Sequence, residues 1–189
     1  LFQTRKKIGM VFQQFNLVKR RTVLQNVLCG RLAHNHLLPS YFSLFSQGDK
    51  MRAMSCLQRV GLETKAAQRV DQLSGGEQQR VGIARALAQQ PKIILADEPV
   101  ASLDPRSTER IMDLLRMINV QDGITMLVSL HDVELIQRYA DRVVGLRGGS
   151  VVFDKVTNHL SLTSSDIDII YGENSSGEHD YIEPNRYVQ

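Results

Sequence analysis

Residues 72–89 read QLSGGEQQRVGIARALAQ, a strong helix-forming stretch that begins with two consecutive glycines. Ser74, followed three residues later by Glu77, predicts a capping box, in which each side chain accepts the other residue's backbone N–H at the first turn. The capping box leaves Gly75 and Gly76 unexplained, because glycine is among the least favourable residues in a helix. Missing side chains at a helix N-terminus let a ligand reach the free N–H groups and the positive end of the dipole, so the pattern predicts an anion site.

Short apolar runs and helical segments alternate around this helix. KIILADEP (92–99) and ITMLVSL (124–130) are near-continuous apolar runs, as is typical of buried parallel strands covered on both faces. IGMVF (8–12) predicts another strand, and Asp104 with Pro105 predicts a helix start with aspartate as the N-cap. We expect that helix to bury a stripe at helical spacing, made of Ile111, Leu114, Leu115 and Ile118. The alternation predicts an α/β domain with a mostly parallel sheet flanked by helices.

The segment between the first strand and the glycine pair predicts a small helical region. TVLQNVLCGRLA (22–33) carries apolar residues at helical spacing, including Leu32, and residues 50–60 carry a second helical pattern. Residues 34–49 contain proline, glycine and the aromatics Tyr41, Phe42 and Phe45, so we expect a loop or a broken helix there.

The last third of the chain is expected to carry smaller elements. Residues 132–140 predict a helix, and RVVGLRGGSVVFD (142–154) predicts a hairpin that turns at Gly148–Gly149. The periodic signal fades beyond about Lys155, and the composition of residues 172–180 is that of a loop or disordered segment.

Composition bounds the class of protein. A chain of 189 residues with 42% hydrophobic residues suits one globular domain, and a net charge of +3 is too small to imply a nucleic-acid partner. Cys29 and Cys56 are far apart without metal-ligand spacing, which indicates a reduced, cytosolic setting. No apolar run approaches the length of a transmembrane helix.

Four polar residues follow the predicted strands. Gln13 follows the first strand, Asp97 and Glu98 end the second, and His131 follows the third. The carboxyl ends of parallel strands form one edge of a sheet, where ligands bind in α/β folds. Each residue also has a purely structural interpretation: solvated loop acids for Asp97 and Glu98, a polar strand end for Gln13 and His131.

The joint order of these motifs resembles the nucleotide-binding domain of ATP-binding-cassette (ABC) proteins. LSGGEQQRVGIARAL is similar to the family's signature, IILADEP to its Walker B strand, and SLD (102–104) to its D-loop. Gln13 resembles the Q-loop glutamine, and His131 resembles the switch histidine. The resemblance implies a P-loop NTPase-like sheet with a small helical subdomain, ATP and Mg²⁺ as cofactors, and a second copy of the chain as partner.

The resemblance also implies a role for each motif residue. Asp97 would hold Mg²⁺, Glu98 would activate the attacking water, and His131 would contact the γ-phosphate. Gln13 would touch Mg²⁺ or that water and signal to a membrane subunit. The remaining nucleotide contacts would be made across a head-to-tail dimer by the signature and the D-loop, with residues Ser74, Gly75, Gly76, Glu77, Gln78 and Asp104.

One family motif is missing from the sequence. No G-x-x-x-x-G-K-[ST] occurs in the 189 residues, and the chain begins without methionine, inside a domain pattern. We expect an N-terminally truncated domain that binds ATP weakly or not at all by itself. An inactive remnant is the alternative to a fragment of a working ATPase.

FQQFNLVKRRTVLQNVLCGRLA (12–33) and ADEPVASLDP (96–105) resemble the ATP-binding subunits of bacterial phosphonate importers. The resemblance implies ATP hydrolysis at the cytoplasmic face of the bacterial inner membrane, with a polytopic permease and, indirectly, a substrate-binding protein as partners. Phe42 and Phe45 belong either to the permease contact or to the subdomain core. The alternatives are an ATPase of the lipoprotein-releasing or macrolide-efflux type and a soluble ABC ATPase of DNA repair or translation.

The expected organisation follows from the same resemblance. Residues 1–155 would form a partial ABC-type ATPase domain, within which residues 14–73 hold the helical subdomain and the lead-in to the signature. Residues 156–189 would form a C-terminal extension with a partly disordered acidic tail.

Overall fold

The computed structural model describes residues 2–34, 45–156 and 162–172. Its contacts divide the chain into two units, Leu1–His131 and Asp132–Gln189. Within the described residues, no helix has both the length and the apolar character needed to cross a bilayer.

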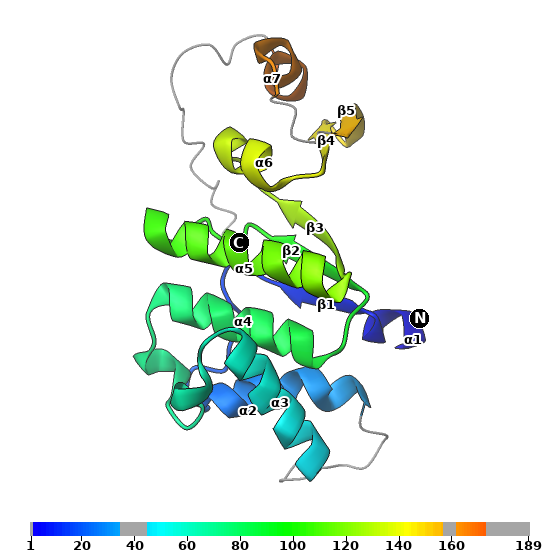
Figure 1. Cartoon of the computed structure of the whole chain (residues 1–189). Coiled ribbons are helices and arrows are strands. Elements are labelled where there is room, and N and C mark those ends of the chain that lie inside the picture. The colour runs from blue at the N-terminus through cyan, green and yellow to red at the C-terminus, as the bar shows by residue number, and fades with distance from the viewer. Residues whose placement is uncertain (1, 35–44, 157–161, 173–189) are drawn as a thin grey trace, which may run out of the picture. The chain divides into compact units, whose positions relative to one another are not determined.

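The first unit is built on a three-stranded parallel sheet (Figure 1). Strands β1 (Ile8–Val11), β2 (Ile93–Asp97) and β3 (Thr125–Ser129) lie in the order β1-β2-β3. The register pairs Val11 with Ala96 and Asp97 with Ser129, so the strands end at one edge. The predicted α/β class and the parallel pairing are confirmed.

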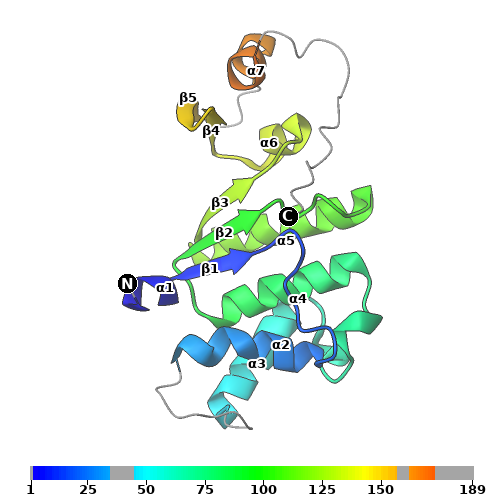
Figure 2. The ribbon, with the colours of Figure 1, turned by 180° about the vertical axis from the view of Figure 1, so that it is seen from behind.

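Helices on one side of the sheet supply most of the core. Helix α4 (Gly75–Ala88) contacts β1 and α5 (Pro105–Asp122), and Figures 1 and 2 show α5 lying against the strands. The helix start at Pro105 is confirmed, because Asp104 caps α5. The buried stripe of α5 consists of Ile111, Met112, Leu115 and Ile118, so Met112 replaces the expected Leu114, which is only half-buried.

The prediction that the strands are covered on both faces is wrong for the described part of the chain. Ile94 and Ala96 are buried on the face that meets the helices. The side chains that alternate with them point to the other face, where Ile93 and Met10 are exposed and Leu127 is 64% exposed. The three strands therefore present a half-open apolar surface.

The small helical region packs on the far side of α4. Helices α2 (Val23–Leu28) and α3 (Gln47–Arg59) contact α4 and each other, and the 3₁₀ segment η1 (Cys29–His34) continues α2. Two shorter 3₁₀ turns, η2 (Glu63–Lys65) and η3 (Val70–Gln72), lead to α4, and helix α1 (Phe2–Lys6) precedes β1.

The helical boundaries differ from the predictions for local reasons. The α-helix predicted over 22–33 changes to 3₁₀ after Leu28, and Leu32 is 58% exposed. The second helix begins at Gln47 rather than residue 50, because Ser46 forms a capping box with Asp49. Phe45 is half-buried, whereas Tyr41 and Phe42 lie outside the described residues.

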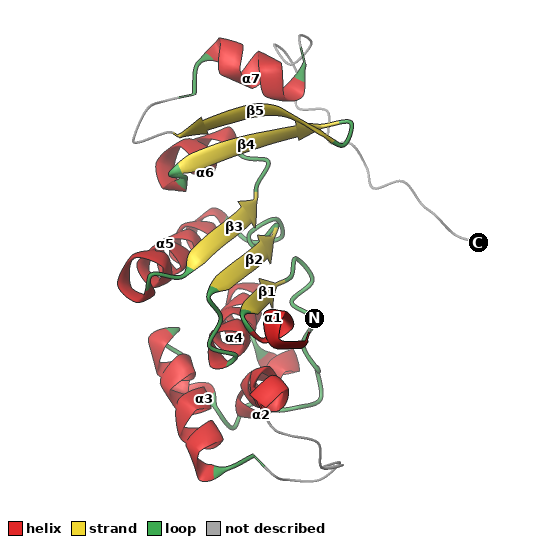
Figure 3. Ribbon diagram, turned by 90° about the vertical axis from the view of Figure 1, so that its right-hand side faces the viewer, coloured by secondary structure: helices red, strands yellow, loops and turns green. Residues whose placement is uncertain are grey.

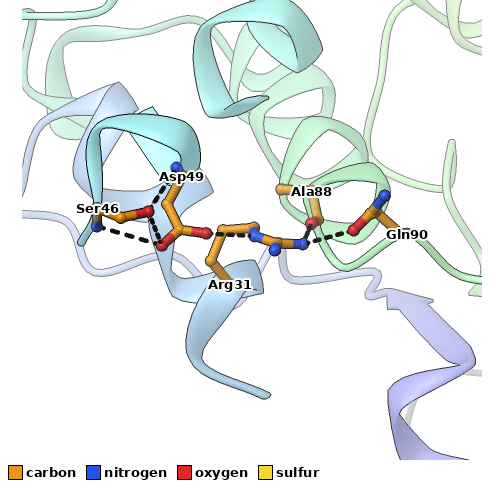
Figure 4. Close-up of polar contacts among 5 residues, drawn as sticks. All are labelled: Arg31, Ser46, Asp49, Ala88 and Gln90. Carbon is orange, nitrogen blue, oxygen red and sulfur yellow. Dashed lines mark hydrogen bonds and ion pairs between the residues drawn. The ribbon is translucent and has the colours of Figure 1, made fainter. Parts of the chain in front are cut away.

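A buried ion pair joins these helical segments (Figure 4). Arg31 Nε donates to Asp49 Oδ1 at 2.8 Å, and both side chains are at most 10% exposed. Arg31 Nη1 donates to the carbonyl oxygen of Ala88, at the end of α4, and to Gln90 Oε1. The Arg31 guanidinium holds the pKa of Asp49 below its ordinary value, so η1, α3 and α4 share one charged junction.

The second unit is an antiparallel hairpin with two helices, α6 (Val133–Tyr139) and α7 (Ser164–Tyr171). Strands β4 (Arg142–Arg147) and β5 (Ser150–Val156) turn at Gly148–Gly149, as predicted, and both glycines have positive φ (Figure 3). The sequence pattern did not predict α7, which lies within the expected C-terminal extension. Residues 157–161 and 173–189 of the expected extension lie outside the described residues.

Candidate functional site

The sheet edge brings together the residues that were predicted at the strand ends. Asp97 is the last residue of β2, Glu98 follows it, and Gln13 lies two residues after β1. His131 lies two residues after β3. The local fold therefore gathers Gln13, Asp97, Glu98 and His131 at the carboxyl edge of the sheet.

A chain of hydrogen bonds connects three of these residues through Ser129. Ser129 Oγ donates to Asp97 Oδ1 at 3.0 Å and accepts the backbone N–H of Glu98 at 2.9 Å. His131 Nε2 lies 2.6 Å from Glu98 Oε1, a contact that needs a proton on one of the two groups. The sequence analysis did not identify Ser129. Its position opposite Asp97 follows from the parallel pairing of β2 with β3.

Glu98 has an unusual backbone conformation. Its φ is +42°, a left-handed value that residues other than glycine rarely adopt. The hydrogen bond from its N–H to Ser129 and the contact of its side chain with His131 hold it there. Backbone strain of this kind gathers at functional sites, where the surrounding structure maintains it.

The tip of α4 forms the second group of predicted residues. Ser74 caps the helix by accepting the N–H of Glu77, and Glu77 Oε2 accepts the N–H of Ser74, so the predicted capping box is confirmed. The N–H groups of Gly75 and Gly76 occupy the first two helical positions, which have no partner inside a helix. The residues at this tip fit an anion.

The side chains of Glu77 and Gln78 have partners within the chain. Lys65 Nζ lies 2.5 Å from Glu77 Oε1, and this contact is the main reason that the pKa of Glu77 is below its ordinary value. Gln78 Nε2 donates to the carbonyl oxygen of Leu73 at 2.9 Å. The positive charge of Lys65 thus balances the carboxylate that stands beside the candidate anion site.

Gly76 has a packing reason that the sequence did not reveal. A Cβ at this position would lie 3.0 Å from Ser107 Oγ and 3.2 Å from Ser107 Cβ, on the first turn of α5. A Cβ on Gly75 would make only ordinary contact with Leu103, at 3.5 Å. The absent side chain at Gly76 therefore lets the signature helix approach the segment that follows SLD.

Asp104 acts as an N-cap within its own chain. Its Oδ1 accepts the N–H of Ser107 at 3.1 Å, and hydrogen bonds from Ser107 hold the pKa of Asp104 below its ordinary value. Asp104 is exposed, so capping leaves its carboxylate accessible to a partner chain.

The metal-binding capacity of the edge is partial. The described residues contain no group of three or more His, Cys, Asp or Glu side chains arranged to hold an ion. Asp97 uses Oδ1 toward Ser129 and has Oδ2 as a second oxygen. Mg²⁺ commonly takes one or two carboxylates and fills its other positions with water and phosphate oxygens, so Asp97 fits as a single ligand.

Comparison with known proteins assigns the family. The ABC transporter family matches residues 2–101, which include the signature helix and the Asp97–Glu98 pair. The chain belongs to the ABC transporter family. Asp104 and His131 lie beyond this match, within the region aligned to full-length relatives.

Two curated relatives of this ABC chain are named as import ATP-binding proteins. The phosphonates import ATP-binding protein PhnC 3 of Nostoc sp. (strain PCC 7120) is 51% identical over 99% of the chain and 70% of the relative. The phosphite import ATP-binding protein PxtA of Stutzerimonas stutzeri is 54% identical over 93% of the chain. The chain spans 63% of the length of that second relative.

A solved ABC structure supports the fold. The dimeric post-hydrolysis state of the ATP-binding cassette MJ0796, bound to ADP and Pi, superposes with a TM-score of 0.65 at 42% identity. The superposition covers 82% of this chain and 65% of that one. The fold is therefore that of ABC ATPase domains, and the family binds ATP.

Proposed function

We propose that the chain is the Q-loop-to-switch part of the ATP-hydrolysing subunit of an ABC importer that takes up a phosphonate or a related phosphorus oxyanion. The observation that carries the proposal is the edge cluster of Asp97, Ser129, Glu98 and His131, together with a signature helix whose first two residues are glycines. The names of the two import relatives support the substrate class and favour it over an efflux system or a soluble ATPase.

The edge residues divide the work of hydrolysis. Bound Mg²⁺–ATP would supply the phosphoanhydride and the charge that neutralises its oxygens. Asp97 would hold the cation through Oδ2, because Oδ1 already accepts from Ser129. Glu98 Oε1 is engaged by His131, which leaves Oε2 to orient the attacking water and accept its proton.

The remaining residues would act on the phosphate. His131 and Gln13 would contact the γ-phosphate and the attacking water from the same sheet edge. The N–H groups of Gly75 and Gly76, with Ser74, would grip the nucleotide held by a second copy, and Asp104 would reach across that interface. Helix-terminal N–H groups and the dipole attract such an anion.

The proposed assembly contains two copies of this subunit and a polytopic permease, which receives cargo from a substrate-binding protein. The solved relative MJ0796 forms a dimer. We place the subunit at the cytoplasmic face of a bacterial inner membrane, without nucleic acid as a partner.

The test compares Glu98→Gln with Glu63→Gln in the product of the complete gene. Glu63 is an exposed acid in η2, outside the edge cluster, so its substitution serves as the matched control. Glu98→Gln should lower ATP turnover by about 10²–10⁴-fold while the protein still binds ATP and dimerises. Normal turnover by this variant would refute the catalytic role, whereas loss of turnover in both variants would refute its specificity.

The substrate class needs a separate measurement. Co-expression with its permease should support ATP-dependent uptake of labelled phosphonate or phosphite into a strain that lacks its own importer. Uptake of neither anion by a complex that hydrolyses ATP would contradict the assigned cargo.

A further inference from the structure

The loop that carries Gln13 has a strained backbone. Phe15 and Asn16 both adopt left-handed conformations, with φ of +59° and +46°. Two consecutive non-glycine residues in this region are energetically unfavourable, because Cβ crowds the neighbouring carbonyl oxygen. Contacts from elsewhere must therefore maintain this turn.

Arg85, in the last turn of α4, supplies such contacts. Its Nη1 donates to the carbonyl oxygen of Asn16 at 2.5 Å, and its Nη2 donates to that of Phe15 at 3.0 Å. The same guanidinium lies 5.9 Å from the centroid of the Phe12 ring. These three partners flank Gln13 in the sequence on both sides.

The strained loop also packs along α4. A Cβ on Gly75 would lie 3.9 Å from Phe15 Cζ, and a Cβ on Gly82 would lie 3.9 Å from the Phe15 carbonyl oxygen. Residues 75 and 82 are seven apart, which places them on one face of the helix. Phe15 therefore lies along one face of α4, between Gly75 and Gly82.

We propose that Arg85 is a positioning residue for Gln13. Its Nη1 and Nη2 groups hold the carbonyl oxygens of Asn16 and Phe15 in the left-handed turn. The position of this turn then determines the position of Gln13 at the sheet edge. Helix α4 would then determine the positions of both its own N-terminal glycines and the loop that carries Gln13. The inference rests on the role proposed above for Gln13 in hydrolysis.

The two hydrogen bonds to neighbouring carbonyl oxygens require two donors at a fixed spacing. A guanidinium presents paired planar donors, whereas the ammonium of lysine is a single point charge. Burial also lowers the pKa of Arg85 below its ordinary value, and the hydrogen bonds to Phe15 and Asn16 replace part of its hydration. Lysine should therefore retain the fold but hold the turn poorly.

The first test measures the loop without nucleotide. Amide hydrogen exchange across residues 12–17 is compared in Arg85→Lys, Arg85→Gln and the control Arg80→Gln, in the complete protein. Arg80 is on the same helix, and its side chain takes part in none of the side-chain hydrogen bonds found among the described residues. Both Arg85 variants should exchange about tenfold faster or more at the loop, and Arg80→Gln should match the parent. Unchanged exchange in a folded Arg85→Lys protein would overturn the proposal, whatever its activity.

The second test asks whether Arg85 acts through Gln13. Arg85→Lys should lower the kcat of ATP hydrolysis by about 10- to 100-fold and leave KM for ATP within about threefold. In a Gln13→Ala background the same change should add less than about threefold, because the group it positions is gone. Fully additive losses would overturn the coupling to Gln13. Full activity of Gln13→Ala alone would instead refute the proposed role of Gln13. Faster hydrogen exchange across residues 12–17 in the Arg85 variants would still support the contact between Arg85 and the loop.

Discussion

At several positions a single added carbon atom would clash with the fold, and the closest such contact is at Gly30. A Cβ there would lie 2.1 Å from the carbonyl oxygen of Arg85, a distance that backbone atoms cannot relieve by rotation. The turn from α2 into η1 therefore approaches α4 through the one residue that has no side chain.

Gly30→Ala should lower the free energy of unfolding by about 3 kcal/mol or more, since it overpacks backbone against backbone. Gly123→Ala is the matched control, because Gly123 has a positive φ but open space where its Cβ would lie. The control should cost about 1 kcal/mol from backbone strain alone. Urea unfolding measures both, and equal losses would show that the close approach is relieved cheaply.

The lowered pKa of Glu77 predicts that the free energy of unfolding depends on pH. Lys65 and the N–H of Ser74 lower the pKa of Glu77 in the folded chain, so the ionised carboxylate stabilises the fold above its ordinary pKa. That contribution is lost as the pH falls through the lowered folded-state pKa.

Glu77→Gln should therefore cost about 1 kcal/mol of unfolding free energy near pH 7 and progressively less toward about pH 3. Glutamine can still complete the capping box, so the difference isolates the charge. Thermal unfolding across this pH range checks it, with Lys65→Met as the companion variant. A gap between parent and Glu77→Gln that stays constant with pH would contradict the assignment.

At the scale of elements, the Arg31–Asp49 pair fastens three helical segments with one buried charge pair. Removing one member leaves the other charge buried without compensation, which is more costly than removing both. Asp49 additionally caps α3 through Ser46, so a change to asparagine keeps part of its hydrogen bonding.

Arg31→Met should lower the unfolding free energy by about 3 kcal/mol or more. Arg31→Met combined with Asp49→Asn should cost less than the sum of the two single changes, as denaturant unfolding of all four proteins would reveal. Strict additivity would mean that the two side chains do not interact in solution.

Local signals in the sequence could predict those elements that depend on neighbouring residues. The Ser74–Glu77 capping box lies within four residues and was predicted, as was the Asp104 cap. The same device occurs at Ser46–Asp49 and at Thr163–Asp166, where weak flanking periodicity concealed it. The helix starts at Gln47 and Ser164 were missed for that reason.

Long-range partners could not be predicted in the same way. Gln13, Asp97, Glu98 and His131 were identified because they lie at strand ends, which share an edge in a parallel sheet, and because the order of their motifs resembles the ABC family. Arg85 contacts residues about seventy positions away, and only the fold reveals that contact. Ser129 and Ser107 likewise gain their partners from strand register and helix packing.

At the scale of the whole molecule, the two faces of the three-stranded sheet differ. One face buries Ile94 and Ala96 against helices, while the other exposes Met10, Ile93 and Leu127. Within the described residues, one apolar face of the sheet therefore lies largely in water.

Leu127→Thr should leave the stability of the 189-residue chain within about 0.5 kcal/mol, because its side chain is already largely in water. Fluorescence of a hydrophobic dye should fall relative to the parent. Ile94→Thr, on the buried face of β2, should cost about 2 kcal/mol or more. Comparable losses at the two positions would show that the outer face is packed in solution.

The left-handed backbone of Glu98 creates a conflict between stability and the proposed ATP turnover at one residue. Glycine would accept that conformation without a steric penalty, so Glu98→Gly would relax the backbone while removing the carboxylate that we propose activates water. If Glu98 has the proposed role, selection for heat resistance alone would favour Glu98→Gly and lose ATP turnover, so position 98 should be held fixed in any stabilisation library.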